Sequence, residues 1–97
     1  MIKYRKRKEV LVYHWTGNIS IINEINNMLQ KTEYKDILKV ELTTTKDILC
    51  ISFKMEPFTT NDFVKVGEYI VFDTDNEIRP LSNYNEERFH ENFIELK

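Results

Sequence analysis

The run from Val64 to Phe72, which reads VKVGEYIVF, is the longest apolar stretch of the chain that favours a β-strand. Alternation puts Tyr69 and Val71 on one face of this strand. The other face receives Ile70 and Phe72, so both faces are apolar. A strand with only one buried face would alternate apolar with polar residues. We therefore expect this strand to be covered on both sides, by other elements of the chain or by a partner chain.

Turn-forming residues border this strand on both sides. Gly67 lies where the chain would turn into the strand, and a positive φ costs little at a glycine. Residues 73–76, DTDN, follow the strand and are typical of a turn. The chain would then return through residues 77–81. Because Pro80 cannot donate a hydrogen bond to a strand ladder, we expect this arm to be an edge strand or to end there.

Length and charge predict one domain spanning residues 1–97, with a modest core that needs neither disulfides nor metal. The formal net charge of −2 gives no general argument for nucleic-acid binding. The charge is unevenly placed, however. Five of the first eight residues are basic, whereas residues 73–97 hold seven acids and three bases. The basic N-terminal arm, residues 1–8, is either a solvated segment or a contact arm for nucleic acid or an acidic partner.

The single cysteine and the lack of long apolar runs indicate a cellular setting. Cys50 cannot form an internal disulfide, which fits a reducing cytoplasm. No apolar run approaches the roughly 18 residues of a membrane-spanning helix, so we expect no membrane contact. The basic start is not followed by the apolar region of a signal peptide. We therefore expect a cytoplasmic protein.

The remaining segments predict a small α+β domain. An apolar stripe at spacings of three and four predicts an amphipathic helix over residues 19–30. Phe89 and Phe93, four residues apart, predict a short C-terminal helix over residues 86–96. Together these segments predict a mainly antiparallel sheet of about five strands, with one helix after the first strand and a short helix at the C-terminus. The predicted strands are residues 9–15, 37–44, 48–55, 64–72 and 77–81, and the predicted loops include 58–62 and 83–85.

No motif carries a recognisable chemistry. Two glycines in the whole chain cannot form a glycine-rich phosphate loop, and neither CxxC nor HExxH occurs. His14, His90 and Cys50 lack the spacing of metal ligands. No nucleophile or orienting partner can be assigned to His14, and the position of Cys50 within a strand favours an inert thiol. We predict no catalytic residue, no metal site, no cofactor and no enzymatic activity.

Two sets of side chains are candidates for binding. Five Tyr, six Phe and one Trp are many for 97 residues, and aromatic rings with a polar tip often anchor binding sites together with arginine. For each candidate in the first set, a purely structural role is the more common explanation. The first set consists of Tyr13, Trp15, Tyr69, Arg79 and Tyr84. The second is a predicted acidic surface, which a solvated helix face would also explain, and consists of Glu86, Glu87, Glu91 and Glu95.

Four short segments resemble, in order, the motifs of one known family. The opening residues 4–6, YRK, are followed by a valine-rich strand that ends in residues 14–17, HWTG. Residues 66–71 read VGEYIV, and residues 89–93 read FHENF. These segments resemble the YRKKP start, the strand ending in QWTG, the PGDYII segment and the closing F-x-x-x-Y helix of a widespread family of small phage and prophage proteins.

The resemblance covers both ends of the chain and leaves residues 18–60 unmatched. The proline after the basic stretch is absent, and His14, Glu68 and Phe93 stand where the family has Gln, Asp and Tyr. The resemblance implies a phage-encoded cytoplasmic protein of an infected or lysogenic bacterium. It implies no catalytic residue, because no activity is established for the family.

Three functions compete. The leading expectation is a non-enzymatic phage accessory protein that binds a host or phage macromolecule, for example to inhibit a defence system or a replication component. Its acidic surface would then imitate nucleic acid or occupy a basic groove. The alternative is a binder of a small ligand such as a nucleotide signal, with Trp15, Tyr69 and Arg79 lining the pocket. The third is nucleic-acid binding through residues 1–8. A homodimer would bury any sheet surface that two short helices leave uncovered.

Overall fold

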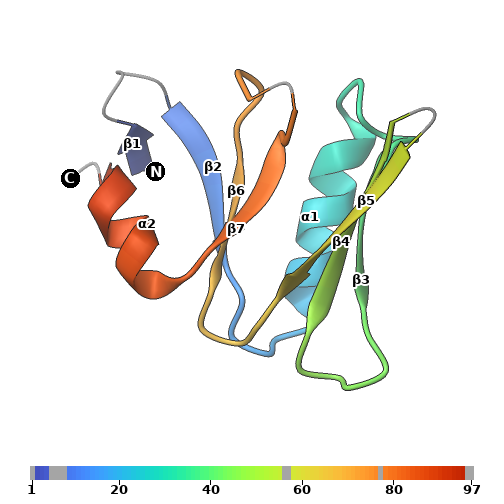
Figure 1. The fold of residues 1–97 in the computed structure, drawn as a ribbon, viewed down its shortest axis with the longest axis horizontal. Helices are drawn as coiled ribbons and strands as arrows, with labels where there is room; N and C mark the ends of the chain where they lie inside the picture. The colour runs from blue at the N-terminus through green and yellow to red at the C-terminus, as the bar shows by residue number, and fades with distance from the viewer. Residues whose placement is uncertain (1, 5–8, 56–57, 77, 96–97) are drawn as a thin grey trace.

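The computed structural model describes residues 2–4, 9–55, 58–76 and 78–95, and it shows an α+β fold with two antiparallel sheets. Figure 1 shows the three-stranded sheet at one end of the molecule and α2 with β1 at the other, with β2, β6 and β7 of the five-stranded sheet between them. The elements are β1 (Ile2–Tyr4), β2 (Glu9–His14), α1 (Ser20–Gln30), β3 (Leu38–Leu42), β4 (Leu49–Met55), β5 (Phe58–Val64), β6 (Tyr69–Phe72), β7 (Leu81–Tyr84), α2 (Glu86–Asn92) and β8 (Phe93–Glu95).

The strands are divided between two sheets, so the predicted single sheet of about five strands is wrong. One sheet has the order β7-β6-β2-β1-β8, and the other has the order β3-β4-β5. Strand β2 joins the two halves of the larger sheet, because Glu9 and Val10 pair with β1 whereas residues 11–14 pair with β6. The α+β class and the antiparallel pairing are confirmed. Two sheets arise because β3, β4 and β5 pair with one another and pack with α1 against the larger sheet, which buries an apolar face of each.

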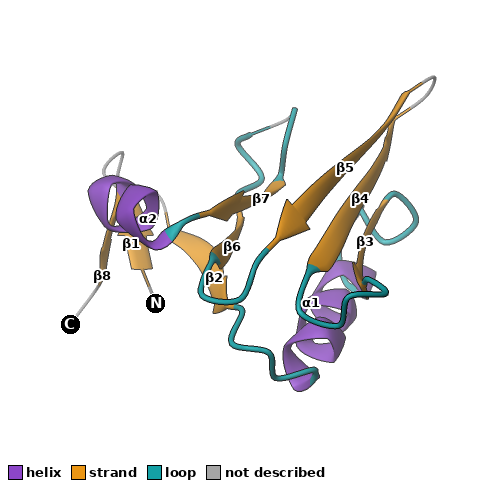
Figure 2. Cartoon of the chain, turned by 60° about the horizontal axis from the view of Figure 1, so that its bottom comes forward, coloured by secondary structure: helices purple, strands orange, loops and turns teal. Residues whose placement is uncertain are grey.

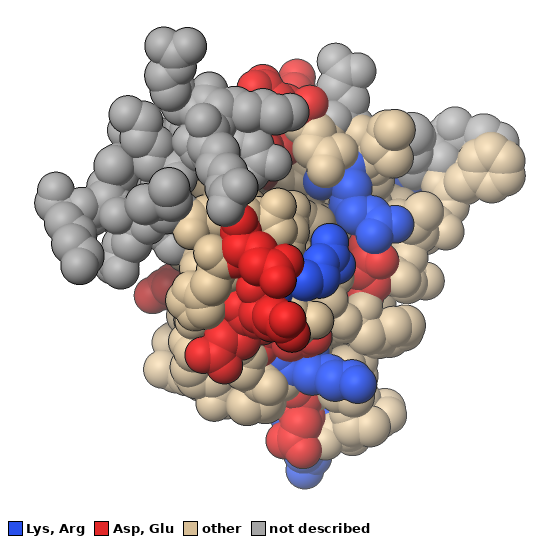
Figure 3. Space-filling view, turned by 60° about the vertical axis from the view of Figure 1, so that its left-hand side comes forward, with Lys and Arg blue, Asp and Glu red and all other residues tan. Residues whose placement is uncertain are grey.

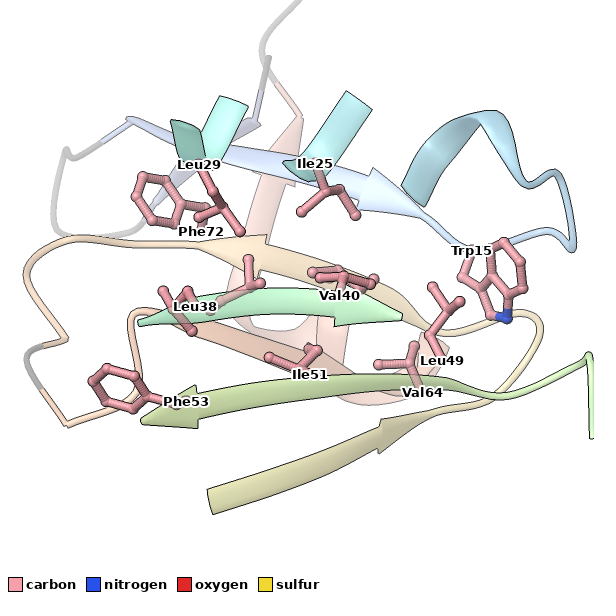
Figure 4. Close-up of a cluster of buried hydrophobic side chains, with 12 residues drawn as sticks. Trp15, Ile25, Leu29, Leu38, Val40, Leu49, Ile51, Phe53, Val64 and Phe72 are labelled. Carbon is pink, nitrogen blue, oxygen red and sulfur yellow. The ribbon is translucent and has the colours of Figure 1, made fainter. Parts of the chain in front are cut away.

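The larger core lies between α1 and the inner faces of both sheets. Ile25 and Leu29 project from α1 towards Val40 of β3 and Phe72 of β6 (Figure 4). Their spacing is the apolar stripe that predicted a helix over residues 19–30, and α1 confirms that helix. The buried members of this core are Trp15, Ile25, Leu29, Leu38, Val40, Leu49, Ile51, Phe53, Val64, Ile70, Phe72 and Leu81.

The predicted strand over residues 64–72 is wrong in its extent, because the chain turns at Gly67: Val64 ends β5 in the three-stranded sheet, and only Tyr69–Phe72 form β6 in the larger sheet. Strand β6 is covered on both faces, as its sequence predicts. Ile70 and Phe72 belong to the larger core, which α1 and the second sheet complete. Val71 lies on the other face, in a smaller cluster with Phe89 of α2. Figure 2 shows α1 and α2 far apart, each against a different part of the strands. Both covers of β6 therefore come from within the chain.

Two strands form where the sequence predicted loops. Strand β5 replaces the expected loop 58–62 and pairs with β4 from Met55–Phe58 to Leu49–Val64, although Val64 is its only buried residue. This strand is therefore stabilised mainly by backbone pairing. Because it has no alternating apolar pattern, the sequence could not predict it. Strand β7 begins at Leu81, directly after Pro80, and continues through Tyr84 into the expected loop 83–85. Gly67 lies in the turn before β6 with φ +97°, which confirms the prediction of a positive φ.

The C-terminal helix is shorter than predicted. Helix α2 ends at Asn92, and Phe93 is extended with φ −128° and ψ 146°. Residues 93–95 then pair with β1, whose residues 2–4 belong to the basic N-terminal arm and so are neither simply solvated nor free of the fold. Pairing with a strand from the other end of the chain overrides the local helical pattern here. Residues 5–8 of the arm lie outside the described residues.

Candidate functional site: the outer face of α2 and the adjoining cleft

A stack of rings seats α2 on the larger sheet. Tyr69 of β6 lies between two other rings and is nearly parallel to both. The centroid of His14 of β2 is 4.3 Å away at 7°, and that of Phe89 is 4.0 Å away at 5°. Phe93 continues the stack at 5.0 Å from Phe89 and meets the edge of Tyr84 at 5.2 Å. Stacked and edge-to-face rings at these separations are favourable contacts.

The register of the strands brings together the rings that the sheet contributes to this stack. His14 is the pairing partner of Tyr69 across β2 and β6, and Tyr84 is the partner of Tyr69 across β6 and β7. Directly opposite residues on antiparallel strands project from the same face, so these three rings form a row under α2. His14 also donates a hydrogen bond from Nε2 to the carbonyl oxygen of Gly67 at 3.2 Å.

Local hydrogen bonds define the ends of α2. Asn85 caps the helix, because its Oδ1 accepts from the backbone N–H of Arg88 at 2.8 Å. Asn92 closes the other end by donating from Nδ2 to the carbonyl oxygen of Arg88 at 2.7 Å. Glu86 and Glu87 occupy the first turn, where the helix dipole favours acids. The short helix is thus held by both its caps and its buried rings.

The outward face of α2 is charged and exposed. Glu86, Glu87 and Glu91 are all exposed, and the side chain of Glu86 is 76% accessible. The imidazole of His90 lies 4.0 Å from the carboxylate of Glu86. Figure 3, which brings the left-hand side of Figure 1 forward, shows acidic side chains gathered near the middle of the view beside basic ones. The side chain of Glu95 lies outside the described part of the structure.

A polar cleft of about 280 Å³ adjoins α2, and we call it the Arg79–Arg88 cleft. It brings together residues from the turn before β6, the β6–β7 connection, β7 and α2. Arg88 lies over the ring of Tyr84, with its guanidinium carbon 5.2 Å from the ring centroid. Arg79 forms an ion pair with Asp62 of β5 at 3.6 Å. The lining residues are Glu68, Asn76, Arg79, Ser82, Asn83, Tyr84, Asn85 and Arg88.

The structure separates the residues that the sequence singled out. Arg79 and Tyr84 line one cleft, and Tyr69 lies inside the ring stack. Trp15 is 0% exposed in the larger core, where its Nε1 donates to the carbonyl oxygen of Asp47 at 2.8 Å. Tyr13 is partly buried against the same core, away from α2. Neither the Arg79–Arg88 cleft nor the larger groove beside β3 holds Trp15, Tyr69 and Arg79 together, as the nucleotide pocket would require.

Sequence reasoning missed Arg88 and Asn83, which complete the Arg79–Arg88 cleft. The spacing of four between Tyr84 and Arg88 could have indicated a contact across the start of the helix. The position of Asn83 carries no comparable signal. Its Nδ2 reaches Glu68 and the backbone of Phe63, which are distant in the chain.

A second, larger groove of about 590 Å³ runs beside β3. Three lysines line it, Lys35, Lys39 and Lys54, but Lys39 already forms an ion pair with Glu41 at 2.6 Å. Asp36 adds a further negative charge to the lining. The mixed charges give this groove no clear preference for one class of ligand.

No group of three or more His, Cys, Asp and Glu side chains that could hold a metal ion occurs among the described residues. In the same part of the chain, neither helix is long and apolar enough to cross a membrane. Comparisons with family models, with curated proteins and with solved structures found no match for this chain. The resemblance to phage proteins therefore stays a prediction from its short motifs.

Proposed function

We propose that this chain is a non-enzymatic binding protein of phage or prophage origin, which acts in the bacterial cytoplasm and engages a host or phage protein through the outward face of α2. The observation that carries the proposal is the ring stack beneath α2. Phe89 is buried against Tyr69, so the orientation of the helix is held while Glu86, Glu87 and Glu91 remain exposed.

A helix held in this way offers its charges at little further cost in entropy. Binding partners lose affinity when side chains and loops must be ordered on contact, and a preorganised surface avoids part of that loss. Three carboxylates on one short helix favour a partner with a basic groove, because complementary potentials speed the encounter and reject acidic competitors. An inhibitor of a nucleic-acid-binding defence or replication protein would use such a surface.

The test compares partner capture by two variants of equal charge. In the first variant, Glu86, Glu87 and Glu91 are replaced by Gln. In the matched control, three exposed acids away from α2, namely Glu33, Asp36 and Asp47, are replaced by Gln, Asn and Asn. Tagged wild-type and variant proteins are incubated with lysate of infected and uninfected bacteria, and the eluates are weighed by native and denaturing mass spectrometry.

We expect the wild-type protein and the control to recover a protein of defined stoichiometry, and the α2 variant to lose it. Recovery should also fall as salt rises, because screening weakens attraction between exposed charges. Equal recovery by all three proteins would show that α2 does not provide the contact and would overturn the proposal.

The other two candidate functions, nucleotide binding and nucleic-acid binding, have less structural support. The nucleotide pocket expected from Trp15, Tyr69 and Arg79 lacks support, since Trp15 lies in the core. Nucleic-acid binding through residues 1–8 stays a prediction, because residues 5–8 lie outside the described part of the chain. Deleting residues 1–8 tests it directly, provided that the loss of β1 is monitored by circular dichroism.

A further inference from the structure

We infer that the Arg79–Arg88 cleft is a binding site for a phosphoryl group, carried by inorganic phosphate or by a small phosphomonoester. The inference is independent of the partner proposed for the outer face of α2. It rests on three features of the cleft: the chemistry of its lining, the way its two arginines are held, and its size.

The lining offers mainly hydrogen-bond donors. All eight lining side chains can form hydrogen bonds, and three of their acceptor oxygens are already engaged. Oδ1 of Asn76 accepts from the backbone N–H of Arg79 at 3.0 Å, and Oδ1 of Asn85 accepts from that of Arg88. Oε1 of Glu68 accepts from the backbone N–H of Lys65 at 2.9 Å and from Asn83 at 3.4 Å.

Most of the groups that face a ligand are N–H and O–H, and Oε2 of Glu68 and Oδ1 of Asn83 are further acceptors in the lining. The donors are the guanidinium groups of the two arginines, the hydroxyls of Ser82 and Tyr84, and the amide N–H groups of Asn76 and Asn85. With two positive arginines and one negative glutamate, the lining itself carries a net charge of +1, and the carboxylate of Asp62 lies beside it, 3.6 Å from Arg79. A ligand that is all acceptor and negatively charged matches this inventory, and a phosphoryl group has three oxygens of that kind.

Both arginines make a contact within the protein, and both keep N–H donors for a ligand. The guanidinium carbon of Arg88 lies over the ring of Tyr84 at 5.2 Å from the centroid, a contact that uses the face of the guanidinium. Arg79 uses Nη1 for Asp62 at 3.6 Å, and its side chain is still 52% exposed. A guanidinium has five N–H donors, so both residues can bind oxygen atoms of a ligand.

The size of the cleft selects a small molecule. Its volume of about 280 Å³ lies just below the range of typical small-ligand pockets. A phosphoryl group and a short organic part fit within that volume. The two arginines belong to the β6–β7 connection and to α2, so two separate elements contribute donors to the cleft.

The test is a titration of the full-length chain with inorganic phosphate, at an ionic strength kept constant with sodium chloride. Nuclear magnetic resonance of the ¹⁵N-labelled protein follows the backbone of Ser82 and Tyr84 and the Nε–H groups of Arg79 and Arg88. We expect saturable shifts at these groups. The melting temperature should also rise, because a ligand that binds only the folded state stabilises it.

Single substitutions locate the site. Arg79→Gln and Arg88→Gln should each weaken phosphate binding by about tenfold, since each removes a charge-assisted hydrogen bond. Arg88→Lys keeps the charge but loses the planar fork, so it should fall between the wild type and Arg88→Gln. Lys31→Gln removes an exposed charge at the end of α1 and should leave binding unchanged.

One variant is expected to bind more tightly, which loss of folding cannot imitate. Asp62 competes with the ligand for Arg79. Asp62→Asn removes the competing charge and should increase affinity for phosphate, with the same residues shifting in the titration.

Glycerol 3-phosphate, used as a second probe, separates the two sources of the phosphoryl group. Tighter binding than phosphate identifies an ester as the ligand, and weaker binding identifies the free anion. Three results would overturn the inference: equal shifts with chloride alone, shifts that map to the lysines beside β3, or unchanged affinity in both Arg→Gln variants.

Discussion

Asn26, a residue of α1, pairs with the backbone of Val40 as a neighbouring strand would. Its Nδ2 donates to the carbonyl oxygen of Val40 at 2.9 Å, and its Oδ1 accepts from the N–H of Val40 at 3.0 Å. Strand β3 is an edge of its sheet, and unpaired edges invite association with other chains. At the opposite edge, Asn83 donates to the carbonyl oxygen of Phe63 in β5 at 3.2 Å. Asparagine side chains thus cover part of both edges of the three-stranded sheet.

Replacing Asn26 by Ala should destabilise the protein. The substitution leaves the N–H and the carbonyl of Val40 without these partners, next to a buried side chain. Leaving buried polar groups unsatisfied costs about 1–3 kcal/mol. Urea denaturation of Asn26→Ala measures the change in the free energy of unfolding. Asn27→Ala is the matched control, because Asn27 is exposed on the same helix, and a surface change of this kind stays within about 0.5 kcal/mol. Equal stability of the two variants would contradict the edge role of Asn26.

Removing the ring of Phe89 should detach α2 from the sheet. Phe89 is 3% exposed and touches the rings of Tyr69 and Phe93. Truncating a buried Phe to Ala costs about 3–5 kcal/mol. Near-ultraviolet circular dichroism, together with thermal denaturation, reports the loss of the stack and the drop in stability.

Two further variants control for that result. His90→Ala removes an exposed neighbouring ring and should change stability little. Phe89→Leu retains much of the apolar volume and should fall between the wild type and Phe89→Ala. A loss below about 1 kcal/mol for Phe89→Ala would mean that the stack does not hold α2.

Two substitutions at positive φ should act in opposite directions. Gly67 has φ +97°, and a Cβ there would meet no atom within 4 Å, so Gly67→Ala adds strain without a clash. Left-handed backbone costs an L-residue about 1–2 kcal/mol. Lys46 already adopts φ 67° in the β3–β4 turn, so Lys46→Gly should relieve strain. Chemical denaturation should show Gly67→Ala below the wild type and Lys46→Gly at or above it. The reverse order would refute the argument.

Stability at alkaline pH should depend on Tyr13. Burial raises the pKa of the Tyr13 phenol above its ordinary value of 10.0, and the carboxylate of Glu24 raises it further. As pH rises through about 10, the unfolded chain loses this proton before the folded chain does. The free energy of unfolding therefore falls between the ordinary pKa and the raised pKa.

Comparison with Tyr13→Phe isolates this contribution from the other groups that titrate there. The stability difference between wild type and variant should be constant below about pH 9 and should decline above pH 10. Denaturation curves at a series of pH values measure it. Glu24→Gln should reduce the decline, and a difference independent of pH would show that Tyr13 does not titrate as proposed.

Much of the fold is visible in the sequence, because several elements bury one regular face. The stripe containing Ile25 and Leu29 predicts α1, and the alternation of Leu49, Ile51 and Phe53 predicts β4. The two apolar faces of β6 correctly indicate that it is covered twice. Strand β5 could not be predicted from the sequence, because it is exposed along most of its length and is stabilised by its pairing with β4.

The candidate site was only half visible. Arg79 and Tyr84 were predicted as binding residues from their residue type alone. Trp15 was predicted in the same way, but it belongs to the core. Arg88 and Asn83 were not predicted, because their importance comes from where β7 and α2 place them. Residue type alone cannot separate an aromatic anchor of a site from a core ring.

The sequence by itself determined the α+β class, the helix α1, the strands with regular apolar faces and the positive φ at Gly67, since these depend on neighbours a few residues away. Only the tertiary structure decided the division into two sheets, the pairing of β8 with β1, the packing of Phe89 on Tyr69 and the placement of Arg79 and Arg88 in one cleft. The physical reason is the separation along the chain of the residues that interact. Local periodicity records which face a segment buries, whereas the choice of partner depends on packing between segments that the chain order does not bring together.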